Sequence, residues 1–107
     1  MGAFKKIVFV GALAAAGAVI AKDVKHYYSF DVGTTARTVN VQLSGSADAD
    51  LYVRRGTRPT ETAYECRPYT SGTNETCTLS HVTGRVHVMV RGYATTSDYK
   101  IRATFAD

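Results

Sequence analysis

Two cysteines, Cys66 and Cys77, have the most chemically specific arrangement in this 107-residue chain. They lie eleven positions apart in the segment ECRPYTSGTNETC, where the residues between them are mostly small, polar or turn-forming. The chain has no CxxC pair and no second pair of cysteine ligands, so the spacing does not indicate a redox motif or a zinc site. In an oxidising compartment the same spacing predicts a disulfide bond.

Histidine is the next residue type that could do chemistry, and the chain contains three: His26, His81 and His87. His26 and His87 lie within alternating strand patterns, and His81 lies at a strand end. None is near a Gly-x-Ser-x-Gly elbow or an HExxH sequence, the motifs that would pair a histidine with a nucleophile or a metal. We therefore predict that the protein is not an enzyme.

Asp48 and Asp50, in the segment SADADLY, could offer carboxylates to calcium, the one cofactor that the sequence suggests. Alternate residues of a strand share a face, so both side chains could point the same way. The EF-hand spacing with its closing glutamate is absent, however, and calcium would need several more oxygen ligands. The alternative is that these acids accept hydrogen bonds from backbone amides where a strand begins.

The first 21 residues, MGAFKKIVFVGALAAAGAVIA, have the composition of a secretory signal peptide. Lys5 and Lys6 precede an apolar run, and the small-residue pattern that ends at Ala21 suits signal peptidase. An apolar run of about 15 residues spans roughly 22 Å as a helix, less than the roughly 30 Å of a bilayer core. We expect no stable membrane anchor, a domain at residues 22–107, and a secreted or cell-surface bacterial protein.

A second hypothesis is that this apolar segment is retained and assembles copies of the protein into an extracellular filament. Small residues would let helices pack closely, or the segment IVFV could add as a strand to the sheet of a neighbouring copy. The residues predicted to make these contacts are Ile7, Val8, Phe9, Val10, Gly11, Ala15 and Ala18.

Net charge gives little support to nucleic-acid binding. The whole chain carries +4, and removal of residues 1–21 would leave eleven Lys and Arg against nine Asp and Glu. Such a mild excess of positive charge is not a basis for predicting a nucleic-acid partner.

After residue 22 the apolar residues alternate with polar ones, the period of a β-strand, and no helical period appears. We predict an all-β fold, a small antiparallel β-sandwich in which each sheet buries one apolar face against the other. The turn ATTS is expected to join the last two strands as a hairpin. The strands are predicted at residues 23–32, 36–45, 49–56, 76–81, 84–93 and 97–105.

Residues 25–105 closely resemble the bacterial pre-peptidase C-terminal domain, a module related to clostridial collagen-binding domains. The segments DADLYVRRG, CRPY, NETC and VMVRGY carry the resemblance, in that order. Ala47 stands where the family usually has glycine. The resemblance implies a jelly-roll-like β-sandwich that commonly follows the catalytic domain of secreted proteases, and that assists secretion or binds an insoluble substrate.

The side chains that alternate outward from the later strands form a candidate binding face. Lys100 and Arg102 are expected beside it on the hairpin partner, and tyrosine and arginine are favoured at binding surfaces. The alternative is an ordinary solvated face in which these residues only form and protect strands. The residues predicted to bind are Tyr52, Arg54, His87, Arg91 and Tyr93.

The sequence thus favours a secreted, non-enzymatic β-sandwich module. Its expected partner is an extracellular polymer, such as collagen or a polysaccharide, or another copy of the chain.

Overall fold

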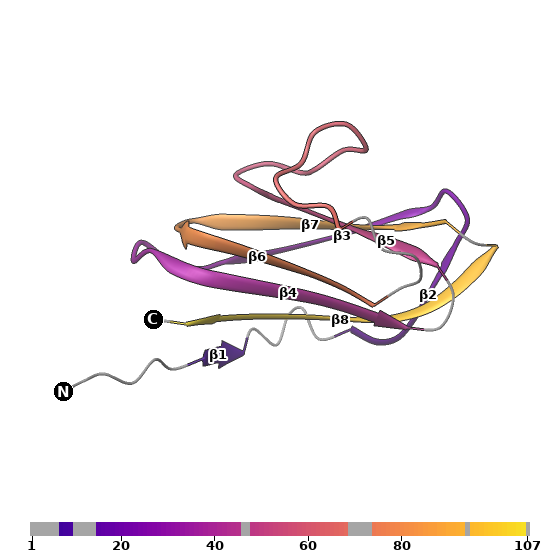
Figure 1. Ribbon diagram of the computed structural model, residues 1–107, viewed down its shortest axis with the longest axis horizontal. Helices are drawn as coiled ribbons and strands as arrows, with labels where there is room; N and C mark the ends of the chain where they lie inside the picture. The colour runs from indigo at the N-terminus through magenta and orange to yellow at the C-terminus, as the bar shows by residue number, and fades with distance from the viewer. Residues whose placement is uncertain (1–6, 10–14, 46–47, 69–73, 94, 107) are drawn as a thin grey trace.

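β-Strands make up the regular secondary structure of the computed structural model, in which no described residue is helical (Figure 1). The structure describes residues 7–9, 15–45, 48–68, 74–93 and 95–106. Within these residues, no helical segment has the length and hydropathy needed to cross a bilayer. The strands of the described residues are β1 (Ile7–Phe9), β2 (Ala15–Ala21), β3 (Lys25–Asp31), β4 (Arg37–Gly45), β5 (Ala49–Arg55), β6 (Glu75–Val82), β7 (Arg85–Gly92) and β8 (Thr96–Ala106).

The strands form two antiparallel sheets that face each other as a sandwich, which confirms the predicted fold class (Figure 1). In the five-stranded sheet, β8 pairs with β4 on one edge and with β1 and β2 on the other, and β4 pairs in turn with β6. In the three-stranded sheet, β7 lies between β3 and β5. From β2 to β8 the chain therefore changes sheet at every connection.

The predicted hairpin between the last two strands is wrong. β7 has both of its edges hydrogen-bonded, to β3 and to β5, so it has no edge left for β8. The chain instead crosses to the opposite sheet, where β8 pairs with β4. Lys100 and Arg102 are exposed on that sheet and do not lie beside the predicted binding face.

Apolar side chains that alternate along the strands meet between the two sheets, as the sequence predicted. Val41 and Ile101 face the core from one sheet, and Leu51 and Val88 face it from the other. Polar atoms also enter this space, where the Tyr99 hydroxyl lies 2.7 Å from His26 Nδ1 and 2.5 Å from the Tyr28 hydroxyl. Burial raises the pKa of Tyr99 well above its ordinary value, and the contact with Tyr28 adds to the effect.

The apolar N-terminal segment contributes β2 to this sandwich. Ile20 is fully buried in the core, and Ala18 packs against the same cluster. A Cβ atom on Gly92 would lie 2.0 Å from the Ala21 carbonyl oxygen, so only glycine allows β7 to approach the end of β2. Cleavage after Ala21, which stays a prediction, would remove a strand and a core side chain from this structure.

The outer edge of β5 is covered by three different acceptors. The amide of Leu51 donates to Glu75 Oε1 at 2.8 Å, that of Val53 donates to the Cys66 carbonyl at 2.9 Å, and that of Arg55 donates to Glu65 Oε2 at 3.1 Å. An open strand edge would otherwise leave these amides available to another chain. The edge of β5 is thus closed by residues that follow it in sequence.

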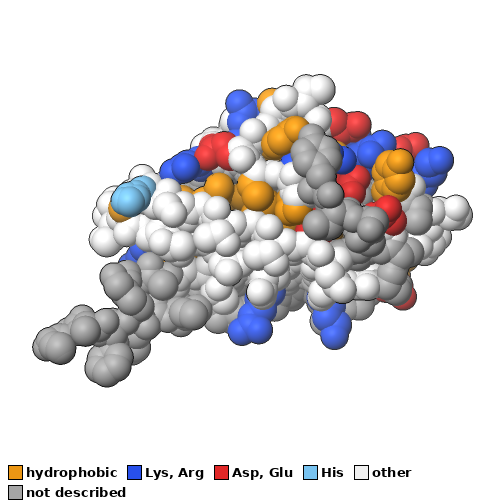
Figure 2. Space-filling model, in the orientation of Figure 1, with side chains coloured by type: hydrophobic (Ala, Val, Ile, Leu, Met, Phe, Trp, Pro, Cys, Tyr) orange, Lys and Arg blue, Asp and Glu red, His pale blue; other side chains and the backbone are white. Residues whose placement is uncertain are grey.

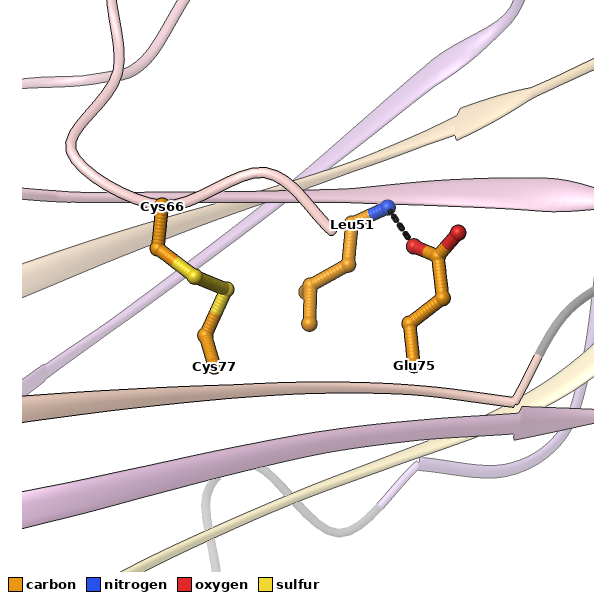
Figure 3. The surroundings of a disulfide bond; sticks show 4 residues. All are labelled: Leu51, Cys66, Glu75 and Cys77. Carbon is orange, nitrogen blue, oxygen red and sulfur yellow. Dashed lines mark hydrogen bonds between the residues drawn. A yellow bond between two sulfur atoms is a disulfide. The ribbon is translucent and has the colours of Figure 1, made fainter. Parts of the chain in front are cut away.

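The predicted disulfide is confirmed and lies at this same edge (Figure 3). Cys66 pairs with β5 of the three-stranded sheet through Val53, whereas Cys77 belongs to β6 of the five-stranded sheet. Their Cα atoms are 5.9 Å apart. The two sheets, which face each other, are therefore joined at this edge by two neighbouring links: the disulfide and the hydrogen bond between Leu51 and Glu75.

We predict that Ile20→Ala lowers the free energy of unfolding of the full-length chain by about 2 to 5 kcal/mol, because it leaves a cavity in the core. Urea unfolding followed by circular dichroism measures the change. Val19→Ala is the matched control, since the neighbouring Val19 is 54% exposed and its loss is expected to matter by no more than about 0.5 kcal/mol. Equal stabilities for the two variants would contradict the burial of β2.

Replacing both cysteines by serine is expected to lower the free energy of unfolding by about 3 kcal/mol, because the unfolded chain regains the entropy of an open loop. Unfolding in urea, with and without reductant, provides the measurement. The reductant should destabilise the wild-type protein and leave the double variant unchanged. A wild-type protein insensitive to reduction would show that the bond does not stabilise the fold.

Candidate functional site

The outer face of the three-stranded sheet carries the predicted binding residues, but a loop covers its centre. This covering loop is the described part of the connection after β5, residues 56–68, and it rises from the sheet in Figure 1. Its Tyr64 ring packs edge-on against Tyr52, with centroids 5.6 Å apart, and the Arg67 guanidinium lies 5.0 Å from the centre of the Tyr52 ring. Tyr52 is therefore only 2% exposed, and its prediction as an accessible binding residue is wrong.

One end of the covered region is a network of opposite charges. Lys25, Arg91 and Asp50 stand in one row across the sheet, and Glu61 of the covering loop lies above it. Glu61 Oε2 is 3.1 Å from Lys25 Nζ and 3.6 Å from Arg91 Nε. Figure 2 shows basic and acidic side chains intermixed along this side of the molecule. The charges here neutralise one another.

Arg91, predicted to bind a polymer, is an internal member of this network. It is 2.8 Å from Asp23 Oδ1 and 3.9 Å from Asp50 Oδ2, and its side chain is 18% exposed. Removing Arg91 would leave the buried Asp50 without one of its two arginine partners. Its main role in this structure is to hold the sheet, its neighbouring turn and the covering loop together.

Asp48 and Asp50, the candidate calcium ligands, have different surroundings. Asp50 Oδ2 lies 3.5 Å from Arg67 Nη2, and burial raises the pKa of its carboxyl despite that arginine. The backbone carbonyl of Asp48 accepts hydrogen bonds from the Tyr93 amide and the Ser97 hydroxyl, both at 3.0 Å. Within the described residues no group of three or more His, Cys, Asp or Glu could hold a metal, so calcium binding stays a prediction without a ligand set.

At the other end of the sheet three arginines surround His87. We call Arg54, Arg58 and Arg85 the arginine cluster. Arg54 lies beside His87 on the neighbouring strand, Arg85 lies two residues before it on its own strand, and Arg58 reaches over from the covering loop. Burial lowers the pKa of His87, and the charges of Arg85 and Arg58 lower it further. Positive charge is concentrated here rather than neutralised.

Tyr93 occupies a third position, beyond the charge network. It is 56% exposed, and Val24 nearby is 41% exposed. The Tyr93 amide is bonded to Asp48, while the Gly92 amide donates to the Val24 carbonyl at 3.0 Å. We call Tyr93 and the backbone that carries it the tyrosine tip. It lies six residues from His87, or roughly 20 Å along the strand.

The single binding face expected from the sequence is therefore two separate surfaces. Arg54 and His87 lie together in one, Tyr93 lies in the other, and Tyr52 and Arg91 lie between them under the covering loop. Sequence reasoning missed Arg58, because its position in a loop gave no sign that it would fold back. Its guanidinium lies 4.2 Å from the centre of the Tyr27 ring on β3.

The remaining histidines have structural surroundings. His26 faces the core and contacts Tyr99, as described above. His81 is exposed, has a φ of 56°, and sits where β6 bulges against β4. Its carbonyl accepts a hydrogen bond from Arg55 Nη1 at 3.2 Å.

The predicted assembly residues lie on the outer edge of β8 where they are described. Ile7, Val8 and Phe9 form β1 and pair with Ala106, Phe105 and Thr104, in that order. Ala15 and Ala18 belong to β2 and pair with Ile101 and Tyr99. Val10 and Gly11 lie outside the described residues. The described part of this segment is thus strand, paired with its own chain, and not a helix.

Known relatives match most of the chain. The alkaline serine exoprotease A of Vibrio alginolyticus is 46% identical over 80 residues, which are 74% of this chain and 15% of the exoprotease. The zinc metalloprotease of Helicobacter pylori is 46% identical over 78 residues, 71% of this chain and 30% of the metalloprotease. The chain thus spans less than a third of either relative.

Two solved structures are similar to this one. The solution structure of vEP C-ter 100 has a TM-score of 0.67 and 37% identity, and the match covers 82% of this chain and 88% of that one. A periplasmic inhibitor of g-type lysozyme, PliG of Aeromonas hydrophila, shares the fold, with a TM-score of 0.63 at 14% identity over 97% of this chain and 88% of the inhibitor. The profile of the bacterial pre-peptidase C-terminal domain matches residues 24–92. With the β-sandwich described above, this match shows that the chain belongs to the bacterial pre-peptidase C-terminal domain family.

Proposed function

We propose that this protein is a secreted, non-catalytic module that attaches to an extracellular polymer through the outer face of its three-stranded sheet. The polymer classes to be considered first are collagen and polysaccharides. The module would hold its own chain, or a protein associated with it, at that material. Several relatives carry the matching region as a small part of a protein named a protease, and one of these is named an extracellular protease.

The names of these relatives support a role apart from catalysis. Similar regions occur in a serine exoprotease and in a zinc metalloprotease, which use different catalytic groups. A region that supplied catalytic residues to one type would not be expected to serve the other. A task that both types share, such as attachment to a substrate or assistance in secretion, accounts for its presence in both.

The observation that carries the proposal is the tyrosine tip. Tyr93 is the most exposed large hydrophobic side chain among the described residues, at 56%, and its backbone is fixed by the bond to Asp48. A tyrosine side chain offers a large contact area and loses little conformational entropy on binding, because it has few rotatable bonds. The ring therefore has the properties of an anchor for a polymer surface.

We expect the purified protein to be retained on at least one of insoluble collagen, chitin and cellulose, and Tyr93→Ala to weaken this retention by about tenfold or more, as loss of an interface anchor does. Binding isotherms from co-sedimentation measure the effect. Val19→Ala is the control, because Val19 is similarly exposed, at 54%, but lies on β2 of the other sheet. Retention that is the same for both variants would rule out the tyrosine tip. Peptide hydrolysis by the purified chain would contradict the non-catalytic part of the proposal.

A second candidate is the extracellular filament, in the form of strand exchange between copies. It is favoured by the pairing of β1 and β2 with the outer edge of β8, because the same hydrogen bonds could form between two chains. Sedimentation velocity over a range of protein concentrations tests it. Exchange predicts oligomers that grow with concentration and are lost when residues 1–21, which carry β1 and β2, are deleted. A monomer at every concentration would exclude exchange.

A further inference from the structure

The two ends of the three-stranded sheet differ in how their charges are compensated. At the Arg91 end Lys25, Arg67 and Arg91 each have a carboxylate within 4.0 Å, as with Lys25 and Glu61 at 3.1 Å. In the arginine cluster, by contrast, no carboxylate of the described residues lies within 4.0 Å of any of the three guanidinium groups. Asp31 stands opposite Arg85 in register and the charge of Arg54 acts on Glu65, but Glu65 is paired with Arg55 and neither carboxylate forms an ion pair with the cluster. Repulsion among the three guanidinium groups therefore works against folding. This arrangement is what a site for an anion requires.

Neutral partners hold each of these guanidinium groups in place. Arg54 Nη1 donates to the Arg58 carbonyl at 3.4 Å, and Arg85 Nη1 donates to the Ser29 hydroxyl at 3.1 Å. Arg58 stacks over the Tyr27 ring. These contacts orient the side chains but do not cancel their charge, and each group keeps N–H donors for another acceptor. The cluster is thus arranged before any ligand arrives, which reduces the entropy lost on binding.

The groups that face His87 complete the description of the cluster. Ser29 stands opposite His87 on β3 and Arg54 stands opposite it on β5. The nearest acidic residue in register is Asp31, which pairs with Arg85 across the strands. Oδ1 of Asp31 accepts a hydrogen bond from the Gly33 amide at 2.7 Å. Arg58 and Arg85 are exposed, and Arg54 and His87 are half-buried, so an incoming group can reach all of them.

We propose that the arginine cluster binds the carboxylate or sulfate groups of an anionic extracellular polysaccharide. Guanidinium groups pair with such oxyanions through two parallel hydrogen bonds, which makes arginine better suited to this task than lysine. Beside the cluster the sheet offers Ser29, His87 and the Tyr27 ring that Arg58 partly covers, so the cluster presents mainly positive charge to a partner. A polysaccharide with regularly spaced anionic groups provides such charge.

This inference rests on the proposed attachment function and specifies the polymer, but it uses a surface distinct from the tyrosine tip. The test measures retention of the full chain on alginate beads and dextran sulfate beads, with uncharged dextran beads as the blank. We expect retention on both anionic supports in dilute salt and its loss near 1 M salt, where the Debye length falls to about 3 Å. The variant Arg54→Gln with Arg85→Gln should bind about tenfold more weakly, because charge-assisted hydrogen bonds are lost.

The matched control is Lys100→Gln with Arg102→Gln, which removes the same charge from exposed positions on the opposite sheet. It should bind as the wild-type protein does, and Arg85→Lys, which keeps the charge but not the paired donors, should give an intermediate affinity. Thermal unfolding of each variant identifies any loss of folding, and Arg85→Lys provides the decisive comparison if the double variant is unstable. Equal losses in the two double variants would mean that only overall charge matters, and would overturn the proposal.

Two further outcomes separate this inference from the proposed function. If the protein is retained on collagen, chitin or cellulose through Tyr93 but not on alginate or dextran sulfate, the attachment function stands and the anionic ligand is wrong. If neither group of supports retains it, both proposals are wrong. Retention by immobilised polyglutamate, with none by the two polysaccharides, would reassign the cluster to an acidic protein and overturn the proposal as stated.

Discussion

The closure of the β5 edge is the interaction on which the rest of this structure depends. Val53 exchanges backbone hydrogen bonds with Cys66, and the disulfide then ties that residue to β6 in the opposite sheet. Glu75 makes a second connection between the sheets by accepting the Leu51 amide. Because both ends of the covering loop are fixed in this way, its middle has to lie against the outer face of the three-stranded sheet. An open β5 edge would leave both the loop and that face exposed.

The position of this loop determines what the surface can do. It covers Tyr52, which strand alternation alone would place in solvent, and it brings Glu61 into the charge network around Arg91. It also delivers Arg58 to the opposite end, where positive charge accumulates. One uniform face thereby becomes a neutral, rigid centre with an apolar tip on one side and a cationic cluster on the other. Such rigidity would favour the proposed attachment, because contacts that are in place before binding lose less entropy.

The N-terminal segment has the sequence pattern of a cleaved export signal, but in the structure its described residues are part of the folded domain. Its lysines and apolar run have the pattern of an export signal, yet Ile20 fills the core and Gly92 leaves room for Ala21. The family match begins at residue 24, just before β3, and does not include β2. β2 also pairs with the edge of β8 that faces away from β4, so this edge of the longest strand is not open where β2 covers it.

The sequence alone was sufficient to predict the strands after residue 22, most of their inward faces and the family, because alternation along a strand and short motifs are properties of residues close together in the chain. It also predicted the disulfide, from cysteine spacing and an expected oxidising environment. It did not predict that β1 and β2 belong to the same sandwich. It could not reveal which strands pair, since successive strands from β2 onward lie in opposite sheets and every ladder joins distant segments. Nor could it show that Tyr52 is covered or that Arg58 joins Arg54 and Arg85, because a loop's path depends on contacts with residues far away in sequence. Only the tertiary structure decided these features, and with them the division of the candidate binding face.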